Sequence, residues 1–216
     1  MAVTGFPSPN FGPRRDGAVP DLIVLHYTGM SDCDAARARL CDPLAEVSAH
    51  WLIRANGMVE ALVPEEMRAW HAGAGEWRGR GDVNSRSVGI EIDNPGDRPF
   101  TEPQMAALER LLPQIMARWS IPASGVIGHS DMAPDRKRDP GPRFDWRRLA
   151  RQGLAIWPEE NRPPSETPLQ VLLDRIGYPA GSAETRLAAF RLRFRPWASG
   201  PEDEEDRRRA AGLAAV

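Results

Sequence analysis

The chain has 216 residues and a mass of 23.9 kDa, which suits one mid-sized domain, or one domain with a small appendage. Its formal net charge of -2 argues against nucleic acid as the main partner, because a duplex-binding domain usually needs a basic excess on one face. No stretch approaches the roughly 18 apolar residues of a membrane span, and residues 1–17 hold no apolar signal-peptide core. We therefore expect a cytoplasmic protein without membrane insertion, with a periplasmic location as the alternative.

Five short segments have the apolar or alternating pattern of β-strands. They are 22–27, 50–53, 58–63, 87–92 and 125–128. The pair Asn56-Gly57 predicts a hairpin between the second and third segments, because these residues supply the positive φ angles of a tight turn.

The segment 33–41 is rich in Ala, Arg and Leu and predicts a helix between the first two strands. In such a helix the two cysteines, Cys33 and Cys41, lie about 12 Å apart along the axis. A disulfide needs Cα atoms within about 7 Å, so we expect free thiols. Free thiols fit a reducing compartment, although buried structural cysteines give the same pattern.

A second helix is expected at 102–119, where apolar residues recur at helical spacing. Thr101 and Gln104 resemble a capping box at its start, and Pro113 predicts a kink or a break inside it. Strands and helices that alternate without a clean βαβ repeat favour an α/β fold, in which helices flank a mixed β-sheet. This core domain is expected to span 1–157.

The segment 158–168 is polar and rich in proline, which is typical of a linker. Helical patterns follow at 168–176, 184–194 and 202–213. They predict a small three-helix bundle, so we expect a second domain at 169–216.

His26, His129 and Asp139 are candidate metal ligands. His26 ends one predicted strand, His129 follows another, and Asp139 lies in a loop stiffened by prolines. Two imidazoles and a carboxylate can occupy three corners of a tetrahedral zinc site and leave the fourth for water. Their spacing alone is also compatible with structural histidines.

Glu91 supports a catalytic site. It alternates with Ile90 and Ile92 in a strand that should be buried, where a carboxylate is costly without a function. A desolvated glutamate near a metal-bound water is a natural general base. The alternative is a buried carboxylate paired with an arginine.

Six motifs occur in one order along the chain. They are His26-Tyr-Thr, Val47-Ser-Ala-His50, Ala69-Trp-His-Ala-Gly73, Asn84-Ser-Arg-Ser-Val-Gly-Ile-Glu91, Gly128-His129 and Lys137-Arg-Asp-Pro-Gly-Pro142. Together they closely resemble the zinc-dependent N-acetylmuramoyl-L-alanine amidases of the type 2 amidase family. The resemblance extends from about Ser8 to about Trp157.

This resemblance implies a bound Zn²⁺ held by His26, His129 and Asp139. It also implies hydrolysis of the amide between N-acetylmuramic acid and L-alanine in muropeptides or peptidoglycan, for cell-wall recycling or turnover. Glu91 would act as the general base, and the Lys137 ammonium would stabilise the developing oxyanion. Whether the sugar must be in its anhydro form, and which oligomer forms, is left open.

The remaining polar and aromatic residues of the motifs have weaker assignments. His71 is placed in the substrate cleft, and Asn84 is expected to bind the substrate or to form a turn. His50 fits a core or a groove position equally well. Trp70 and Trp77 either stack on a sugar or pack in a wall.

The C-terminal segment shows a fainter resemblance to the three-helix peptidoglycan-binding module. It rests on 169–173, 176–178 and 185–190, whereas Arg191 stands where that module usually carries glutamine. The bundle is thus expected to bind glycan or peptide, or only to pack against the catalytic domain.

Two rival functions stay open. Relatives of this fold bind peptidoglycan without cleaving it, but such receptors typically lack a zinc ligand that is present here. A zinc hydrolase for an unrelated amide is the other rival, which only the resemblance excludes.

Overall fold

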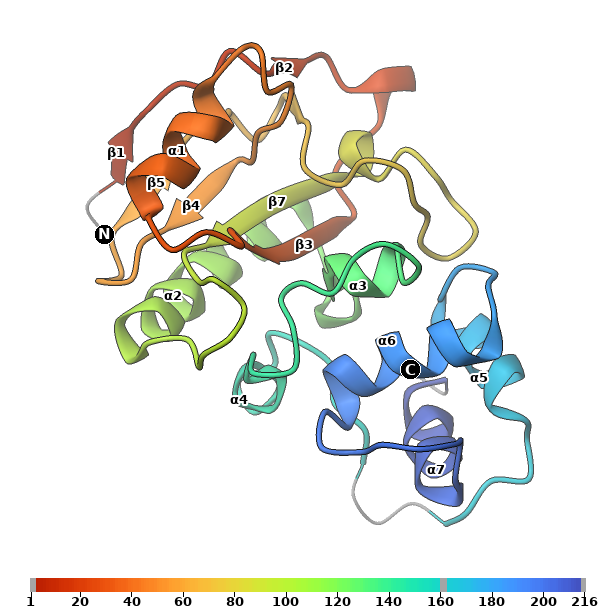
Figure 1. Ribbon diagram of the computed structural model, residues 1–216. Coiled ribbons are helices and arrows are strands. Elements are labelled where there is room, and N and C mark those ends of the chain that lie inside the picture. The colour runs from red at the N-terminus through yellow and green to blue at the C-terminus, as the bar shows by residue number, and fades with distance from the viewer. Residues whose placement is uncertain (1–2, 160–162, 215–216) are drawn as a thin grey trace.

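A six-stranded mixed β-sheet forms the centre of the molecule in this computed structural model, which describes residues 3–159 and 163–214 (Figure 1). Strands β4, β7, β3 and β8 are parallel, β5 is antiparallel to β4, and β1 is parallel to β5. In sheet order the strands are β1 (Val3–Gly5), β5 (Val59–Ala61), β4 (Trp51–Ile53), β7 (Ser87–Ile92), β3 (Leu22–Tyr27) and β8 (Val126–Gly128). A second, two-stranded sheet pairs β2 (Phe11–Gly12) with β6 (Arg68–Ala69).

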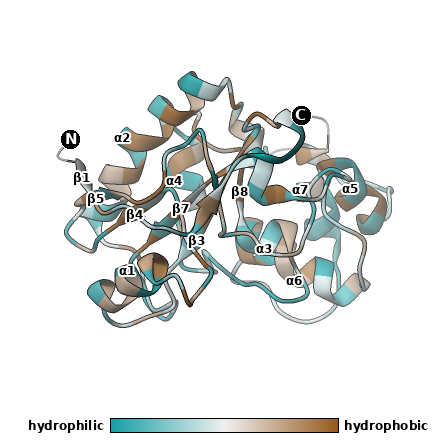
Figure 2. Ribbon diagram, turned by 90° about the horizontal axis from the view of Figure 1, so that it is seen from above, coloured by the Kyte–Doolittle hydropathy of each residue, from teal (hydrophilic) through white to brown (hydrophobic). Residues whose placement is uncertain are grey.

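The two faces of β7 differ in polarity, and this difference positions the site. Val88, Ile90 and Ile92 are fully buried in the core that the sheet shares with α2 (Glu102–Trp119). Because side chains alternate along a strand, Ser87, Gly89 and Glu91 lie on the opposite face. Helix α1 (Cys33–Cys41) covers the β4 end of that face, where Leu40 packs near Leu52. Figure 2 shows α1 and α2 on opposite sides of the central strands.

Helix α2 has the expected capping box, since Thr101 and Gln104 exchange side-chain to backbone hydrogen bonds. Of the kink or break expected at Pro113, the break does not occur, because one helix runs from Glu102 to Trp119. Pro113 lies on the exposed face of the helix. Water can therefore satisfy the carbonyl group that the missing proline N–H leaves without a partner.

The two cysteines are free, as expected. Cys33 is buried at the first residue of α1, and Cys41 is half-buried at the last residue of the same helix. Burial raises the pKa of the Cys33 thiol to about 12, so this thiol stays protonated at neutral pH.

Three helices, α5 (Leu169–Ile176), α6 (Ala183–Phe194) and α7 (Glu204–Leu213), follow the sheet domain. Their apolar residues share one core with the face of the sheet that points away from α2, where Leu22, Val24 and Ile127 lie. The short helix α3 (His129–Met132) lies between β3 and α6, and α4 (Trp146–Ala150) precedes the linker (Figure 1). The helices therefore pack against the sheet domain.

The division into domains at 1–157 and 169–216 stays a prediction. Of the expected linker, residues 160–162 lie outside the described part of the chain, as do 1–2 and 215–216 at the ends of the two domains. Within the described ranges, no helix is long and apolar enough to cross a membrane.

Candidate metal centre and active-site cleft

Neighbouring strands bring the candidate residues to one edge of the sheet. In the register of β3 and β7, His26 pairs directly with Glu91, so both side chains leave the same face. Leu25 pairs with Gly128 at the end of β8, and the next residue, His129, begins α3. Carboxyl ends of parallel strands commonly carry binding sites.

Three side-chain atoms converge at this edge. His26 Nδ1 lies 2.9 Å from His129 Nδ1 and 2.8 Å from Asp139 Oδ2, and His129 Nδ1 lies 3.0 Å from the same carboxylate oxygen. The backbone holds the loop in place, because Ser130 N–H donates to the Asp139 carbonyl oxygen (2.9 Å). All three side chains are buried. They form a group that could hold a metal ion.

Hydrogen bonds at the outer ring nitrogens determine where the protons lie. His129 Nε2–H donates to the Ala72 carbonyl oxygen (2.9 Å), which leaves a lone pair on its Nδ1. Ser87 Oγ–H donates to the Val83 carbonyl (2.5 Å), so Ser87 Oγ accepts from His71 Nε2–H (3.2 Å). His71 Nδ1 therefore accepts from His26 Nε2–H (3.0 Å). Both Nδ1 atoms of the metal centre thus present lone pairs toward each other.

The electrostatics of the site agree with a neutral His26 imidazole. Burial lowers the pKa of His26 to about 4, and proximity to His129 adds to this shift. Burial alone would raise the pKa of Asp139, but the close contacts of its carboxylate with the His129 and His26 rings hold it well below the usual range. At neutral pH the centre thus offers two lone pairs and one carboxylate, a donor set that fits Zn²⁺.

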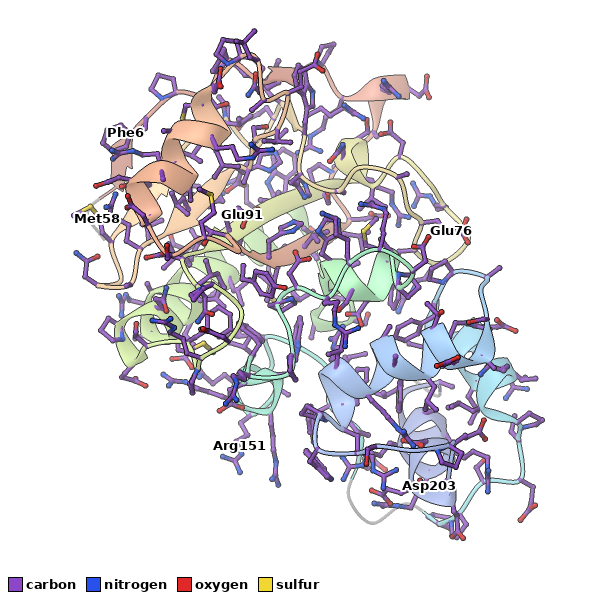
Figure 3. The ribbon with its side chains drawn as sticks, viewed as in Figure 1. Phe6, Met58, Glu76, Glu91, Arg151 and Asp203 are labelled. Atoms are coloured by element: carbon purple, nitrogen blue, oxygen red, sulfur yellow. The ribbon has the colours of Figure 1, made fainter. Side chains whose placement is uncertain are left out.

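Glu91 of β7, which Figure 3 labels, lies in the same cleft as this centre. Its Oε2 is buried without a partner among the described residues. Burial raises the pKa of Glu91 well above its ordinary value, the Asp139 carboxylate raises it further, and the Lys137 ammonium opposes the shift. Glu91 and Lys137 line one cleft with the three candidate ligands. The structure therefore brings all five residues together.

The cleft has a volume of about 460 Å³. Its wall includes arginine side chains that the sequence analysis did not single out: Arg39, Arg136 and Arg138. Two of them immediately flank Lys137, so the basic run 136–138 was the available signal. A cleft with this many cations suits an anionic ligand.

The residues with weaker assignments have varied environments. His71 and Trp70 line the cleft. Asn84 is buried, and its Oδ1 accepts hydrogen bonds from the N–H groups of His71 and Ala72. The substrate roles of His71 and Asn84 stay predictions.

His50 and Trp77 are core residues. His50 is fully buried, and its Nδ1 accepts from Gly89 N–H (2.9 Å) while Nε2–H donates to the Met67 carbonyl (3.0 Å). Trp77 packs edge-to-face on Tyr178 with 5.3 Å between ring centroids. These contacts agree with core packing for His50 and with wall packing for Trp77, the alternatives that require no ligand.

The sequence is similar to those of two muramyl-L-alanine amidases of Escherichia coli. The 1,6-anhydro-N-acetylmuramyl-L-alanine amidase AmpD of Escherichia coli is 36% identical over 160 residues, 66% of this chain and 87% of AmpD. The N-acetylmuramoyl-L-alanine amidase AmiD of the same species is 37% identical over 209 residues, 81% of this chain and 75% of AmiD.

Solved structures extend the similarity over nearly the whole chain. AmiD from E. coli, in complex with the substrate anhydro-N-acetylmuramic acid-L-Ala-D-gamma-Glu-L-Lys, matches with a TM-score of 0.81 at 35% identity, covering 93% of this chain and 91% of that one. AmpDh3 from Pseudomonas aeruginosa, in complex with anhydromuramic pentapeptide, matches with a TM-score of 0.82 at 28% identity, covering 97% and 95%. The expected mixed-sheet α/β fold is confirmed. Since the family profile matches residues 16–142, the chain belongs to the N-acetylmuramoyl-L-alanine amidase family, as its motifs indicated.

Proposed function

We propose that this protein is a zinc-dependent amidase that hydrolyses the bond between N-acetylmuramic acid and L-alanine in muropeptides, including those with the anhydro sugar. The observation that carries the proposal is the unpartnered Glu91 carboxylate oxygen beside three converging ligand atoms. His26, His129 and Asp139 would hold the zinc ion. Family membership, the substrate named for AmiD and the anhydromuramic pentapeptide in the AmpDh3 complex support the choice of bond.

The side chains of the cleft divide the remaining work. Zinc, when bound, supplies Lewis acidity for the scissile carbonyl and for the attacking water. Glu91 accepts a proton from that water and delivers it to the nitrogen of L-alanine as the C–N bond breaks. The products are the lactyl carboxylate and the free amine of the peptide. Lys137 places its charge beside the oxygen that becomes negative in the transition state.

The cationic wall suggests how the peptide is recognised. Stem peptides carry free carboxylates, and Arg39, Arg136 and Arg138 supply guanidinium groups along the cleft. We propose that these arginines bind the peptide part of the substrate. Peptidoglycan binding by α5–α7, and the cytoplasmic or periplasmic location, stay predictions.

The rival function is a non-catalytic peptidoglycan receptor. A receptor needs neither a complete ligand triad nor a desolvated general base. Burying the Glu91 carboxylate without a partner costs free energy, and binding alone gives no reason for that cost. The complete constellation therefore favours the enzyme.

Product analysis by mass spectrometry tests the proposal. The zinc-loaded protein should split an anhydro-muramyl tripeptide into anhydro-N-acetylmuramic acid and the free tripeptide. Glu91→Gln should retain zinc by elemental analysis and lose about 10²–10⁴-fold in rate. Glu66→Gln, at an exposed glutamate, is the matched control and should keep the wild-type rate. Cleavage at another bond, or an active Glu91→Gln enzyme, would contradict the proposed reaction or its mechanism.

A further inference from the structure

The outer ring nitrogens of the two candidate histidine ligands form hydrogen bonds with adjacent residues of one loop, His71 and Ala72. The outer nitrogen of His26 donates to the His71 side chain (3.0 Å), and that of His129 donates to the Ala72 backbone carbonyl (2.9 Å). Arg136 also donates to this carbonyl, at 2.6 Å. A shift of this two-residue segment would therefore move both ligand rings together.

Asn84 fixes this segment to the body of the protein. Its Oδ1 accepts from the N–H of His71 (3.0 Å) and from the N–H of Ala72 (2.8 Å). Asn84 itself lies in the 3-10 turn Val83–Arg86, which immediately precedes β7. Arg14 stabilises that turn by donating to the carbonyls of Ser85 (2.8 Å) and Asn84 (3.3 Å). The Asn84 side-chain oxygen thus accepts hydrogen bonds from both N–H groups of the segment.

Strand β7 completes the arrangement around His71. Ser87 accepts from His71 Nε2–H and so fixes the ring tautomer. Gly89 gives the ring its space, because a Cβ atom there would lie 2.4 Å from His71 Cγ. The cleft-facing row of β7 therefore supports the ring of His71 from one side, while Asn84 supports its backbone.

We propose that Asn84 and His71 are positioning residues of the metal centre, which hold both imidazole ligands in the orientation and tautomer that zinc requires. Ligand histidines generally depend on such outer partners, whose loss costs about 10–100-fold in metal affinity. The inference rests on the metal site of the proposed function, but not on the identity of the bond that is cleaved.

The alternative is that Asn84 contacts the substrate. Its exposed fraction is 6%, it is absent from the residues that line the cleft, and its carbonyl oxygen already has two donors. A substrate contact would raise KM and leave zinc affinity unchanged. Loss of a positioning contact lowers zinc affinity in the absence of any substrate.

Zinc affinity, measured by competition with a fluorescent chelator, tests the proposal. Asn84→Leu has a similar volume without an acceptor and should bind zinc about 10–100-fold more weakly than wild type. Asn84→Asp keeps an oxygen acceptor and should remain within a few-fold of wild type. His71→Phe retains a ring without the Nδ1 acceptor and should weaken zinc binding by a similar factor.

Cobalt(II) substitution adds a spectroscopic measurement. At saturating metal, Asn84→Leu should change the position and intensity of the cobalt d–d bands, because the ligand rings are no longer held in one orientation. In zinc-saturated protein its kcat should fall while KM stays near the wild-type value. Thermal unfolding of the metal-free variants checks that each of them is folded.

Wild-type zinc affinity and an unchanged cobalt spectrum in folded Asn84→Leu would overturn the proposal. A raised KM with unchanged zinc affinity would assign Asn84 to the substrate instead. These outcomes are separable from the proposed function, because zinc affinity is measured without substrate. A wild-type protein that binds zinc but cleaves no muropeptide would contradict the amidase proposal alone, whereas one without zinc affinity would contradict both.

Discussion

The four histidines of the chain differ in the partners of their ring nitrogens. His26 and His129 direct Nδ1 toward the candidate metal centre and donate from Nε2. His71 accepts from His26 and donates to a serine, whereas His50 bridges two backbone groups. Each hydrogen-bond arrangement fits a neutral ring, so the protein avoids the free-energy cost of burying a charged imidazolium.

The buried His50 should make the metal-free protein sensitive to acid. Its pKa is lowered by burial to about 3, while the unfolded chain has a pKa near 6.5. Between these values the unfolded state binds more protons, so stability falls as the pH falls. For this one group we expect a loss of about 2 kcal/mol between pH 7 and pH 5.

Chemical denaturation in the presence of a chelator measures this loss. His50→Gln cannot take up a proton, so its free energy of unfolding should fall less than that of wild type over the same pH range. Both proteins share the other three histidines, and the difference therefore reports His50 alone. Identical pH dependence in the two proteins would show that His50 is not held neutral.

The sequence identifies site residues better than it identifies their contacts. Ordered motifs were sufficient to single out His26, His129, Asp139, Glu91 and Lys137, which the fold brings together in one cleft. Motifs do not show which residue forms a hydrogen bond with each histidine ring nitrogen, because the partners lie on loops from distant parts of the chain. For this reason the sequence left Asn84 open between a substrate contact and a turn, and the structure adds that its side chain contacts the segment that carries His71.

At the scale of elements, β7 separates the core from the cleft. One row of its side chains is Val, Ile and Ile, and the other is Ser, Gly and Glu. The first row makes the strand stable within the sheet, whereas the second row supplies a hydroxyl, a space and a carboxylate to the site. A glycine inside a strand often marks such a close approach.

Gly89→Ala should disturb the metal centre without adding a polar group. The new methyl group would meet the ring of His71 at 2.4 Å, so the ring or the strand must move. We expect a loss of about 1–3 kcal/mol in unfolding free energy and a clear drop in zinc affinity. Gly12→Ala is the control, because a Cβ atom there has no neighbour within 4 Å. Equal zinc affinity in both variants would contradict the steric role of Gly89.

Long and strongly patterned elements were predictable, and short ones were not. Strand β3 and helix α2 occur at the expected residues. Strands β2 and β6 have only two residues each, and α3 has four, so each sequence contains about one period of a strand or helix pattern, too little to recognise. Such segments take their conformation from tertiary contacts, as α3 does between β3 and α6.

At the scale of the whole molecule, the C-terminal helices are joined to the metal centre by a buried polar cluster. Asp131, two residues after His129, pairs with Arg193 of α6 (2.7 Å) and accepts from the Tyr178 hydroxyl (2.8 Å). Asp131 also accepts from the Gly128 N–H (2.8 Å), directly before the ligand. Within the helical part, Arg191 pairs with Asp206 and bonds two carbonyls of the connecting loop, which agrees with a packing role at this position.

Arg193→Met should be strongly destabilising, because it leaves the Asp131 carboxylate buried without its cation. Breaking a buried pair in this way costs about 3–5 kcal/mol. The double variant Asp131→Asn with Arg193→Met removes both charges and should be more stable than the single variant. Arg98→Met, at an exposed ion pair, should change the unfolding free energy far less than Arg193→Met does. A double variant no more stable than the single one would contradict the ionic role of this pair.

Helix α3 lies between strand β3, which carries His26, and helix α6 of the bundle. This position has a thermodynamic consequence. A ligand that binds the bundle and stabilises α6 would also stabilise the α3 segment that begins with His129, through the Asp131–Arg193 pair. Free-energy coupling of this kind is reciprocal, so metal binding would strengthen the binding of that ligand by the same factor. A helical module joined to the sheet domain only by a flexible linker would lack these contacts. Binding of a ligand to such a module could not change the metal affinity of the active site in this way.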